Sequence, residues 1–396
     1  MMKQIKIFNV NFGDCFLCES EEENKAAMLV DFGSTRSIVD CVADEVNSSL
    51  RKFENKYLMI SHFHSDHYSG IHRLDDDIIF NEVYLPNFFT DDVIRLQLVV
   101  LAVLSESNPA HGVALNLLSV VPDLLNHLNN FSRICYVKRK EKIFNQVDSC
   151  RILWPDINDF NDEAKEIFNK LVDYYGLSVK LGQFNDLVAS YINLFPTIDN
   201  NEGFYMQFND EYLAESQHYK QEAENIKNKV IELFKEDKIS VKRIDREINK
   251  QLSSFQNEIS ICFDNVADEG GVTTKSVLFL SDISRDNYYK IANATDGLKI
   301  AGEYKAIKVA HHGTKGYFVN NLPKSEYLII SNGNASNDSW RITSLYGWNY
   351  SDSTFICTNY TNACDYEFAC KKCDAYNKNG GVCGINLPNV VYDLLL

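Results

Sequence analysis

Three histidines and an aspartate fall within six positions of the sequence, at His62, His64, Asp66 and His67. They follow an apolar segment, residues 56–60, whose pattern predicts a buried strand. Because side chains alternate along an extended chain, we expect His62 and His64 to share one direction and Asp66 and His67 to lie on the turn that follows. Imidazole and carboxylate groups at this spacing suit zinc or manganese, with His62 and His64 on one ion and Asp66 and His67 on another.

Two further polar positions follow apolar, strand-like segments later in the chain. Asp282 comes directly after residues 276–281, and the pair His311 and His312 follows a strand predicted at residues 304–310. A carboxylate can bind two cations at once, about 3.5–4 Å apart, so we predict that Asp282 bridges two ions rather than serving as an ordinary turn residue. Only one of two neighbouring residues readily points into a site from a strand end, and we favour His311 as the ligand. His312 would then contact the substrate.

Short strands and a few helices would have to position these residues. Alternating or apolar runs between turn residues predict strands at residues 4–10, 15–19, 26–31 and 56–60, with a helix at 37–50. A second set of strand-like runs covers residues 134–138, 150–153, 258–263, 276–281, 304–310, 327–331 and 354–358. Helical spacing of apolar residues predicts helices at 91–104 and 112–128 and through much of residues 156–255. Two β-rich halves are therefore expected around a helical segment.

The His-x-His-x-Asp-His pattern after a strand resembles the metal-binding signature of the metallo-β-lactamase fold superfamily. Motifs at Asp31-x-Gly, at Asp282 and at the paired histidines resemble the later signatures of that superfamily and occur in its order. The segments around Asp14 and Asn257, together with the His-His-Gly-Thr run, are similar to the nuclease-like domain of ComEC-type DNA-uptake proteins and their soluble relatives. The likeness covers residues 1–155 and 256–358.

This resemblance implies an α/β fold, namely an αββα sandwich of two face-to-face sheets with helices outside. The core would comprise residues 1–155, with a helical segment at 91–130, and residues 256–358. A helical insertion at 156–255 would interrupt the core, and a Cys-rich appendage at 359–396 would follow it. We interpret the insertion as a structural helical cap, with a substrate-gating lid as the alternative.

The resemblance also assigns roles around the ions. The implied ligands are His62, His64, Asp66, His67, Asp282 and His311. The family usually places one more histidine before the bridging aspartate, where the ComEC-like branch has an Asn/Ser segment matched here by Asn257. We therefore expect Asn257 beside the site and one ion short of a protein ligand. Asp14 and Asp31 would accept hydrogen bonds from ligand imidazoles and loop amides, with a simple turn role as the alternative.

The implied activity is hydrolysis at a dinuclear centre, with a metal-bound hydroxide as nucleophile and Asp66, His311 and His312 at the catalytic position. The ComEC-like motifs favour a phosphodiesterase or nuclease acting on nucleic acid, with defence against foreign DNA as a hypothesis for its role. One alternative is a small-molecule hydrolase acting on a nucleotide, a phosphocholine-like ester, a lactone or a thioester. Another is a metal-containing sensor or scaffold without turnover that binds protein partners through the insertion or the tail.

Composition and charge limit where and how the protein would act. Lys and Arg number 39 and Asp and Glu 55, so the net charge is 39 − 55 = −16, which excludes a generally basic surface that coats nucleic acid. The densest basic run, residues 138–142, could line a path for a phosphodiester backbone, although we favour a solvated hairpin turn. The sequence lacks a signal peptide and an apolar segment of membrane-spanning length, so we expect a cytoplasmic protein with no membrane contact.

The chain contains 11 cysteines, several of them near its end. Cys370 and Cys373 have the spacing of a zinc knuckle, and Cys364 and Cys383 would complete a four-cysteine structural zinc site. Free thiols are the main alternative, and a redox switch is a further one.

Overall fold

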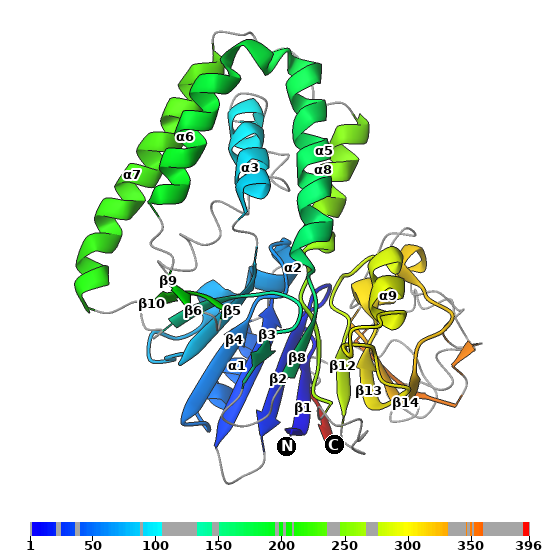
Figure 1. Cartoon of the computed structure of the whole chain (residues 1–396). Helices are drawn as coiled ribbons and strands as arrows, with labels where there is room; N and C mark the ends of the chain where they lie inside the picture. Colours follow the sequence, from blue (N-terminus) through cyan, green and yellow to red (C-terminus); the bar gives the residue numbers. More distant parts are fainter. Residues whose placement is uncertain are drawn as a thin grey trace.

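The structure, a computed structural model, describes residues 2–20, 25–35, 40–87, 90–104, 133–144, 150–194, 198–200, 203–207, 210–235, 246–266, 276–331, 346, 349–350, 352–358 and 391–395. In this part of the chain, two mixed β-sheets lie below a group of long helices (Figure 1). The protein therefore has the α/β character that the sequence predicts.

The first sheet contains both the beginning and the end of the chain. Its nine strands lie in the order β16 (Val391–Leu395), β1 (Met2–Phe8), β2 (Cys15–Ser20), β3 (Ala26–Phe32), β4 (Asn55–Met59), β5 (Glu82–Pro86), β6 (Arg133–Val137), β10 (Gly203–Gln207) and β9 (Ile198–Asn200). Strands β3 to β6 are parallel, and the remaining neighbours are antiparallel.

The second sheet is built mainly from the later part of the sequence. Its seven strands lie in the order β15 (Thr354–Cys357), β14 (Lys324–Ile330), β13 (Glu303–Lys308), β12 (Val277–Phe279), β11 (Cys262–Asp264), β8 (Cys150–Trp154) and β7 (Lys142–Ile143). Strands β12 to β15 are parallel, whereas β7, β8 and β11 pair antiparallel.

The two sheets pack face to face through apolar side chains. Phe16 of β2 meets Phe279 of β12 edge to face at 5.5 Å between ring centroids, within one buried cluster drawn from both sheets. Helix α1 (Asp40–Leu50) covers the other face of the first sheet, where Val46 joins a second buried cluster. Helix α9 (Arg285–Ala292) adds Tyr288 to the core that the sheets share.

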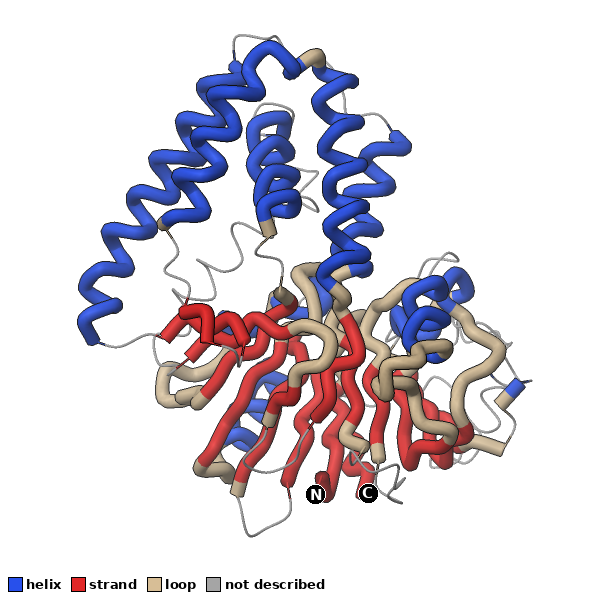
Figure 2. Tube along the Cα trace, in the orientation of Figure 1, coloured by secondary structure: helices blue, strands red, loops and turns tan. Residues whose placement is uncertain are grey.

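Longer helices form an arch on one side of the sheets (Figure 2). One side of the arch contains α6 (Leu181–Asn193) and α7 (Asp210–Lys235), and the other contains α5 (Ile157–Tyr175) and α8 (Arg246–Glu258). Helix α3 (Asp91–Leu104) lies between the two sides. Helix α3 contacts α5, α6 and α7, so it joins the helices of the later segment although it belongs to an earlier part of the chain. None of the helices in the described residues is long and apolar enough to cross a membrane.

Several elements differ from the sequence predictions. The strand predicted at residues 258–263 is wrong over its first half, because α8 continues through Glu258 and β11 begins only at Cys262. The helical spacing of the buried residues Ile248, Leu252 and Phe255 continues to Ile259 and outweighs the local preference for a strand.

Two further differences concern the segments between and after the sheets. Strands β9 and β10 lie within the region predicted as a helical insertion and extend the first sheet beyond β6. Strand β16 lies within the region predicted as a Cys-rich appendage and pairs with β1. The basic run at residues 138–142 links β6 of one sheet to β7 of the other instead of forming a hairpin within one sheet, and Arg139 forms an ion pair with Asp296 at 2.8 Å.

Candidate metal centre

The chemically active residues lie where strands of both sheets end. In the first sheet, Asp31 is at the end of β3 and His62 follows β4. In the second sheet, Asp282 follows β12, the paired histidines follow β13, and Ser331 follows β14. Because parallel strands end at the same edge of a sheet, the two sheets bring residues from distant parts of the sequence to one place.

A short helix, α2 (Ser65–Tyr68), presents Asp66 and His67 to this place. Two glycines allow the chain to pass directly against it. A Cβ on Gly13 would lie 2.7 Å from the carbonyl oxygen of Asp66, and a Cβ on Gly33 would lie 2.4 Å from the amide nitrogen of His67. The Asp14 amide also donates to the Asp66 carbonyl at 2.9 Å. The backbone at Gly13, Asp14 and Gly33 therefore contacts α2 directly and holds it in position.

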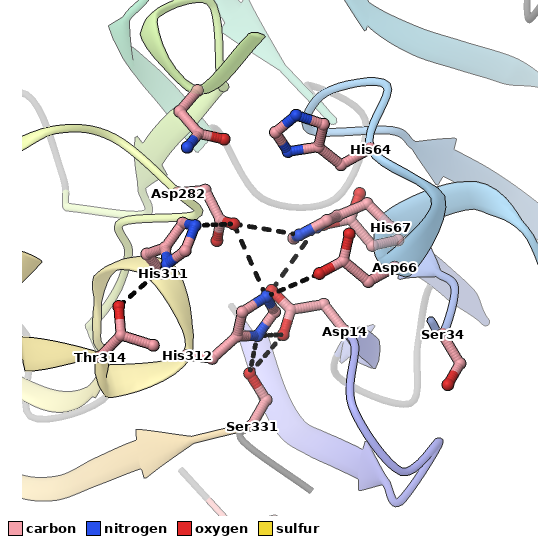
Figure 3. Close-up of polar contacts among 12 residues, drawn as sticks. Asp14, Ser34, His64, Asp66, His67, Asp282, His311, His312, Thr314 and Ser331 are labelled. Atoms are coloured by element: carbon pink, nitrogen blue, oxygen red, sulfur yellow. Dashed lines mark hydrogen bonds and ion pairs between the residues drawn. The ribbon is translucent and has the colours of Figure 1, made fainter. Parts of the chain in front are cut away.

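Four imidazoles converge on one oxygen atom, Oδ2 of Asp282. Their Nε2 atoms lie 3.8 Å from it for His62, 3.3 Å for His67, 3.7 Å for His311 and 3.6 Å for His312. Figure 3 shows His67, His311 and His312 directed toward this carboxylate. All five residues are buried. Asp282 Oδ2 nevertheless has no hydrogen-bond partner, and neither does Nε2 of His67. Buried donor atoms this close together could hold a metal ion.

The other ring nitrogen of each imidazole contacts a side-chain oxygen. Nδ1 of His62 lies 3.1 Å from Ser61 Oγ, and Nδ1 of His67 lies 2.8 Å from Asp31. Nδ1 of His311 lies 2.9 Å from Thr314 Oγ1. These contacts orient each ring so that Nε2 faces the centre, as the outer partners of metal ligands do.

His311 and His312 both point into the centre, so the expectation that only one of them would do so is wrong. Their backbones lie in the left-handed region, with φ of 45° and 56°, and Gly313 continues the turn at φ 77°. The alternation of side chains that holds for a strand does not apply to such a turn. His312 Nε2 also lies 3.2 Å from Asp66 Oδ2, and its Nδ1 lies 3.2 Å from Asp14 Oδ1.

The remaining predicted residues lie at the edge of this group. His64 Nδ1 is 3.0 Å from His62 Nε2, and His64 Nε2 is buried without a hydrogen-bond partner. Asp31 accepts hydrogen bonds from the amide and the hydroxyl of Ser61, each at 2.7 Å. Asn257 is buried near the end of α8 and donates to the Tyr317 hydroxyl at 2.8 Å. Cys364, Cys370, Cys373 and Cys383 lie outside the described residues.

Sequence reasoning missed Lys308, which lies at the end of β13 and is 1% exposed. Its Nζ lies 2.6 Å from Asp14 Oδ2 and 3.4 Å from Asp282 Oδ1. The lysine thus engages one oxygen of Asp282 and leaves the other to the imidazoles. A lysine within the otherwise apolar residues 306–310, directly before the paired histidines, was the available signal, because a charge in a buried strand requires a partner.

Sequence reasoning also missed Ser331, which follows β14. Its hydroxyl donates to Asp14, and its Oγ lies 3.2 Å from Nδ1 of His312. A serine at the end of an apolar strand carries no distinctive signal.

The imidazoles fall into two electrostatic groups. Burial lowers the pKa of His62 and of His64, and it lowers the pKa of His311 to about 4, so these rings are neutral. Burial also opposes protonation of His67 and His312, but nearby carboxylates, Asp282 foremost, outweigh it. They raise the pKa of His67 well above its usual value and the pKa of His312 to about 9.

The formal charge of the centre supports a fit to cations. The centre contains four buried carboxylates, those of Asp14, Asp31, Asp66 and Asp282, and one buried lysine, which gives −4 + 1 = −3 when the imidazoles are neutral. Protons on His67 and His312 offset part of this charge, but a metal ligand must be a neutral imidazole, and without those protons the buried charge is costly. Divalent cations would offset it, and the neutral imidazole and carboxylate donors suit zinc or manganese. The part of the chain that the structure describes therefore contains a group that could hold metal ions, as predicted.

The sequence matches no model of a known protein family, and a search of curated proteins finds no match to it.

Proposed function

We propose that this protein is a metal-dependent hydrolase with the αββα sandwich of the metallo-β-lactamase fold, and that it cleaves phosphodiesters. The observation that carries the proposal is the convergence of four imidazole Nε2 atoms on the unpartnered Oδ2 of Asp282. Sheets packed face to face, with α1 outside the first, support the proposed fold.

The ligand assignment follows from the positions of the side chains. His62, His64 and His311 would hold one ion, and Asp66, His67 and His312 the other, with Asp282 shared between them. Asp66 and His312 lie 3.2 Å apart, which supports their assignment to one ion. The sequence led us to expect that one ion would lack a protein ligand. In this assignment His312 is that ligand.

The residues of the chain have separate tasks in this scheme. Bound divalent ions would supply a water of lowered pKa and electrostatic stabilisation of the charge that develops on the substrate. Lys308 and Ser281 keep Asp282 in place, since Lys308 Nζ contacts both the Asp282 carboxylate and the Ser281 carbonyl oxygen, the latter at 3.1 Å. Asp31 and Thr314 hold ligand imidazoles in the orientation that directs Nε2 inward.

Phosphodiesters, in particular those of nucleic acid, are the proposed substrate class. The likeness of the segments around Asp14 and Asn257 and of residues 311–314 to the ComEC-type nuclease domain supports this choice. A centre for two cations also suits in-line displacement at phosphorus, because both the attacking and the leaving oxygen can be stabilised. Because the net charge of the protein is −16, the cations of this centre, rather than a basic surface, would hold a polyanion.

The test begins with protein that has been stripped by a chelator and reloaded with zinc or manganese. We expect metal-dependent turnover of bis-p-nitrophenyl phosphate and cleavage of DNA or RNA, but not of a lactone or a thioester. The double variant His62→Ala/His64→Ala should lose its bound metal, and its activity should fall by roughly 10²-fold or more. Its circular dichroism spectrum should equal that of the wild type. His72→Ala, which alters an exposed histidine, is the matched control. Undiminished turnover in the double variant would reject the proposed centre.

A further inference from the structure

One polar group beside the centre is not used by the proposed ligands. Tyr317 lies six residues after His311, and its ring stacks on the His311 imidazole with the centroids 3.9 Å apart and the planes 7° from parallel. His311 Nε2 is in turn 3.7 Å from the shared oxygen of Asp282. The compact turn after β13, in which the Tyr317 amide bonds to the Thr314 carbonyl at 3.1 Å, produces this stacking. The phenol therefore lies beside the imidazole that faces the centre.

Asn257 holds the phenol from the other side. Its Nδ2 donates to the Tyr317 hydroxyl oxygen at 2.8 Å. Asn257 is 4% exposed, and its Oδ1 has no hydrogen-bond partner. Because the hydroxyl accepts from Asn257, its own hydrogen points elsewhere, and Tyr317 itself is only partly buried. Among the described residues, the hydroxyl makes no other hydrogen bond that would occupy this donor.

We propose that Tyr317 contacts the substrate and donates a hydrogen bond from its hydroxyl to a non-bridging oxygen of the phosphoryl group. This inference rests on the proposed phosphodiesterase function and adds a substrate contact to it. A centre lined by carboxylates needs donors that face the anionic substrate, and a hydroxyl fixed by stacking and by Asn257 requires little reorganisation. The phenol keeps its proton throughout, so no bond to it forms or breaks.

The first test is Tyr317→Phe, which preserves the stacked ring and removes only the hydroxyl. We expect kcat for bis-p-nitrophenyl phosphate to fall by roughly 10²-fold, as for loss of one donor that acts on developing charge. Metal content and melting temperature should equal those of the wild type. Tyr289→Phe removes a hydroxyl that bonds to Asn320 on the surface and should leave kcat unchanged.

A second variant separates the hydroxyl from the ring while Tyr317 stays in place. In Asn257→Asp the size is kept, but the new carboxylate can only accept, so it takes the hydrogen that the hydroxyl would otherwise give to the substrate. We expect a loss of kcat similar to that of Tyr317→Phe. The double variant should be no worse than either single one, because both remove the same interaction.

Binding of thymidine 5′-monophosphate to the metal-loaded protein, measured by calorimetry, keeps this inference distinct from the proposed function. Tyr317→Phe should weaken binding by roughly 10-fold, the usual effect of losing a hydrogen bond to a charged group. If the wild type neither cleaves diesters nor binds the monophosphate, the proposed function is wrong. If the wild type does both and Tyr317→Phe matches it, the substrate contact is wrong. A variant that loses metal would instead make Tyr317 a support for His311 and would equally overturn the contact.

Discussion

Lys308 shows how one buried residue can set the charge of a whole site. It contacts Asp14 and Asp282, both almost wholly buried. Burial opposes ionisation of both carboxyls, but the Lys308 charge foremost lowers the pKa of Asp14, and His312 and His67 foremost, with a smaller contribution from Lys308, lower the pKa of Asp282. Removing one member of a buried ion pair leaves the other uncompensated, which typically costs about 3–5 kcal/mol. The lysine is therefore expected to matter most when no cation is bound.

Lys308→Met should lower the melting temperature of the metal-free protein, because two carboxylates then lose their cationic partner. Added zinc or manganese should restore much of the loss, since it supplies the same compensation. Lys305→Met is the control, because it removes a lysine on the same strand whose partner, Glu326, is half-exposed. It should lower the free energy of unfolding by at most about 1 kcal/mol. Scanning calorimetry with and without metal checks this, and equal melting temperatures for the two metal-free variants would contradict it.

Asp282→Asn should reduce the bound metal toward one ion per chain and the turnover by roughly 10²-fold, because the amide cannot replace the shared carboxylate charge. Metal analysis and turnover of bis-p-nitrophenyl phosphate would measure both effects. Asp286→Asn, at an exposed position in α9, provides the matched control. Two retained ions together with full turnover in Asp282→Asn would show that Asp282 is not a bridge.

At the scale of elements, the centre depends on how closely separate turns approach each other. Helix α2 has only four residues, too few for a helix that is stable by itself, so its neighbours must hold it. Gly13 and Gly33 provide the space for this contact. Any side chain at Gly33 would press on the backbone that carries Asp66 and His67.

Gly33→Ala should therefore displace α2, lower stability by roughly 1–3 kcal/mol and weaken metal binding. Gly182→Ala is a matched control within α6, where an added Cβ meets nothing within 4 Å and the helix should gain up to about 1 kcal/mol. Denaturant unfolding and metal titration of the two variants test whether Gly33 provides the space that α2 needs. If Gly33→Ala binds metal as tightly as the wild type, this role of Gly33 is wrong.

At the scale of the whole molecule, the electrostatics of the centre link folding to pH. The pKa of His312 is raised from 6.5 to about 9, so the stability it contributes is complete below pH 6.5 and is lost as the pH rises through 9. The pKa of Asp66 is lowered from 3.8 to about 2, so its contribution is present above pH 3.8 and is lost as the pH falls through 2. Metal binding needs deprotonated imidazoles and therefore strengthens as the pH rises.

The metal-free protein should consequently melt at a lower temperature at pH 9.5 than at pH 6, whereas the metal-loaded protein should not show this decrease. Melting curves of chelated and loaded protein over this range provide the measurement. In His312→Gln the decrease should be smaller, because the residue that releases the proton is gone. A metal-free wild type that is equally stable at both pH values would show that His312 does not carry a proton in the folded state.

The sequence alone determined the features that depend on neighbours along the chain. The spacing of His62, His64, Asp66 and His67 after an apolar strand, and most strands of both sheets, could be predicted because alternation and residue type are local properties. The end of α8 could not be predicted in this way, since Ile259 joins the buried cluster that contains Ile248 and Phe255, and such burial depends on tertiary packing.

Only the tertiary structure decided which residues complete the centre. Ser331 and Asp14 are 317 positions apart and yet form a hydrogen bond, which no local pattern contains. Lys308 and Tyr317 gain their roles from partners on other elements, Asp14 and Asn257 respectively. His312 enters the centre because the chain turns through left-handed conformations there, and such a turn is held by the packing of the surrounding structure rather than by the preferences of its own residues.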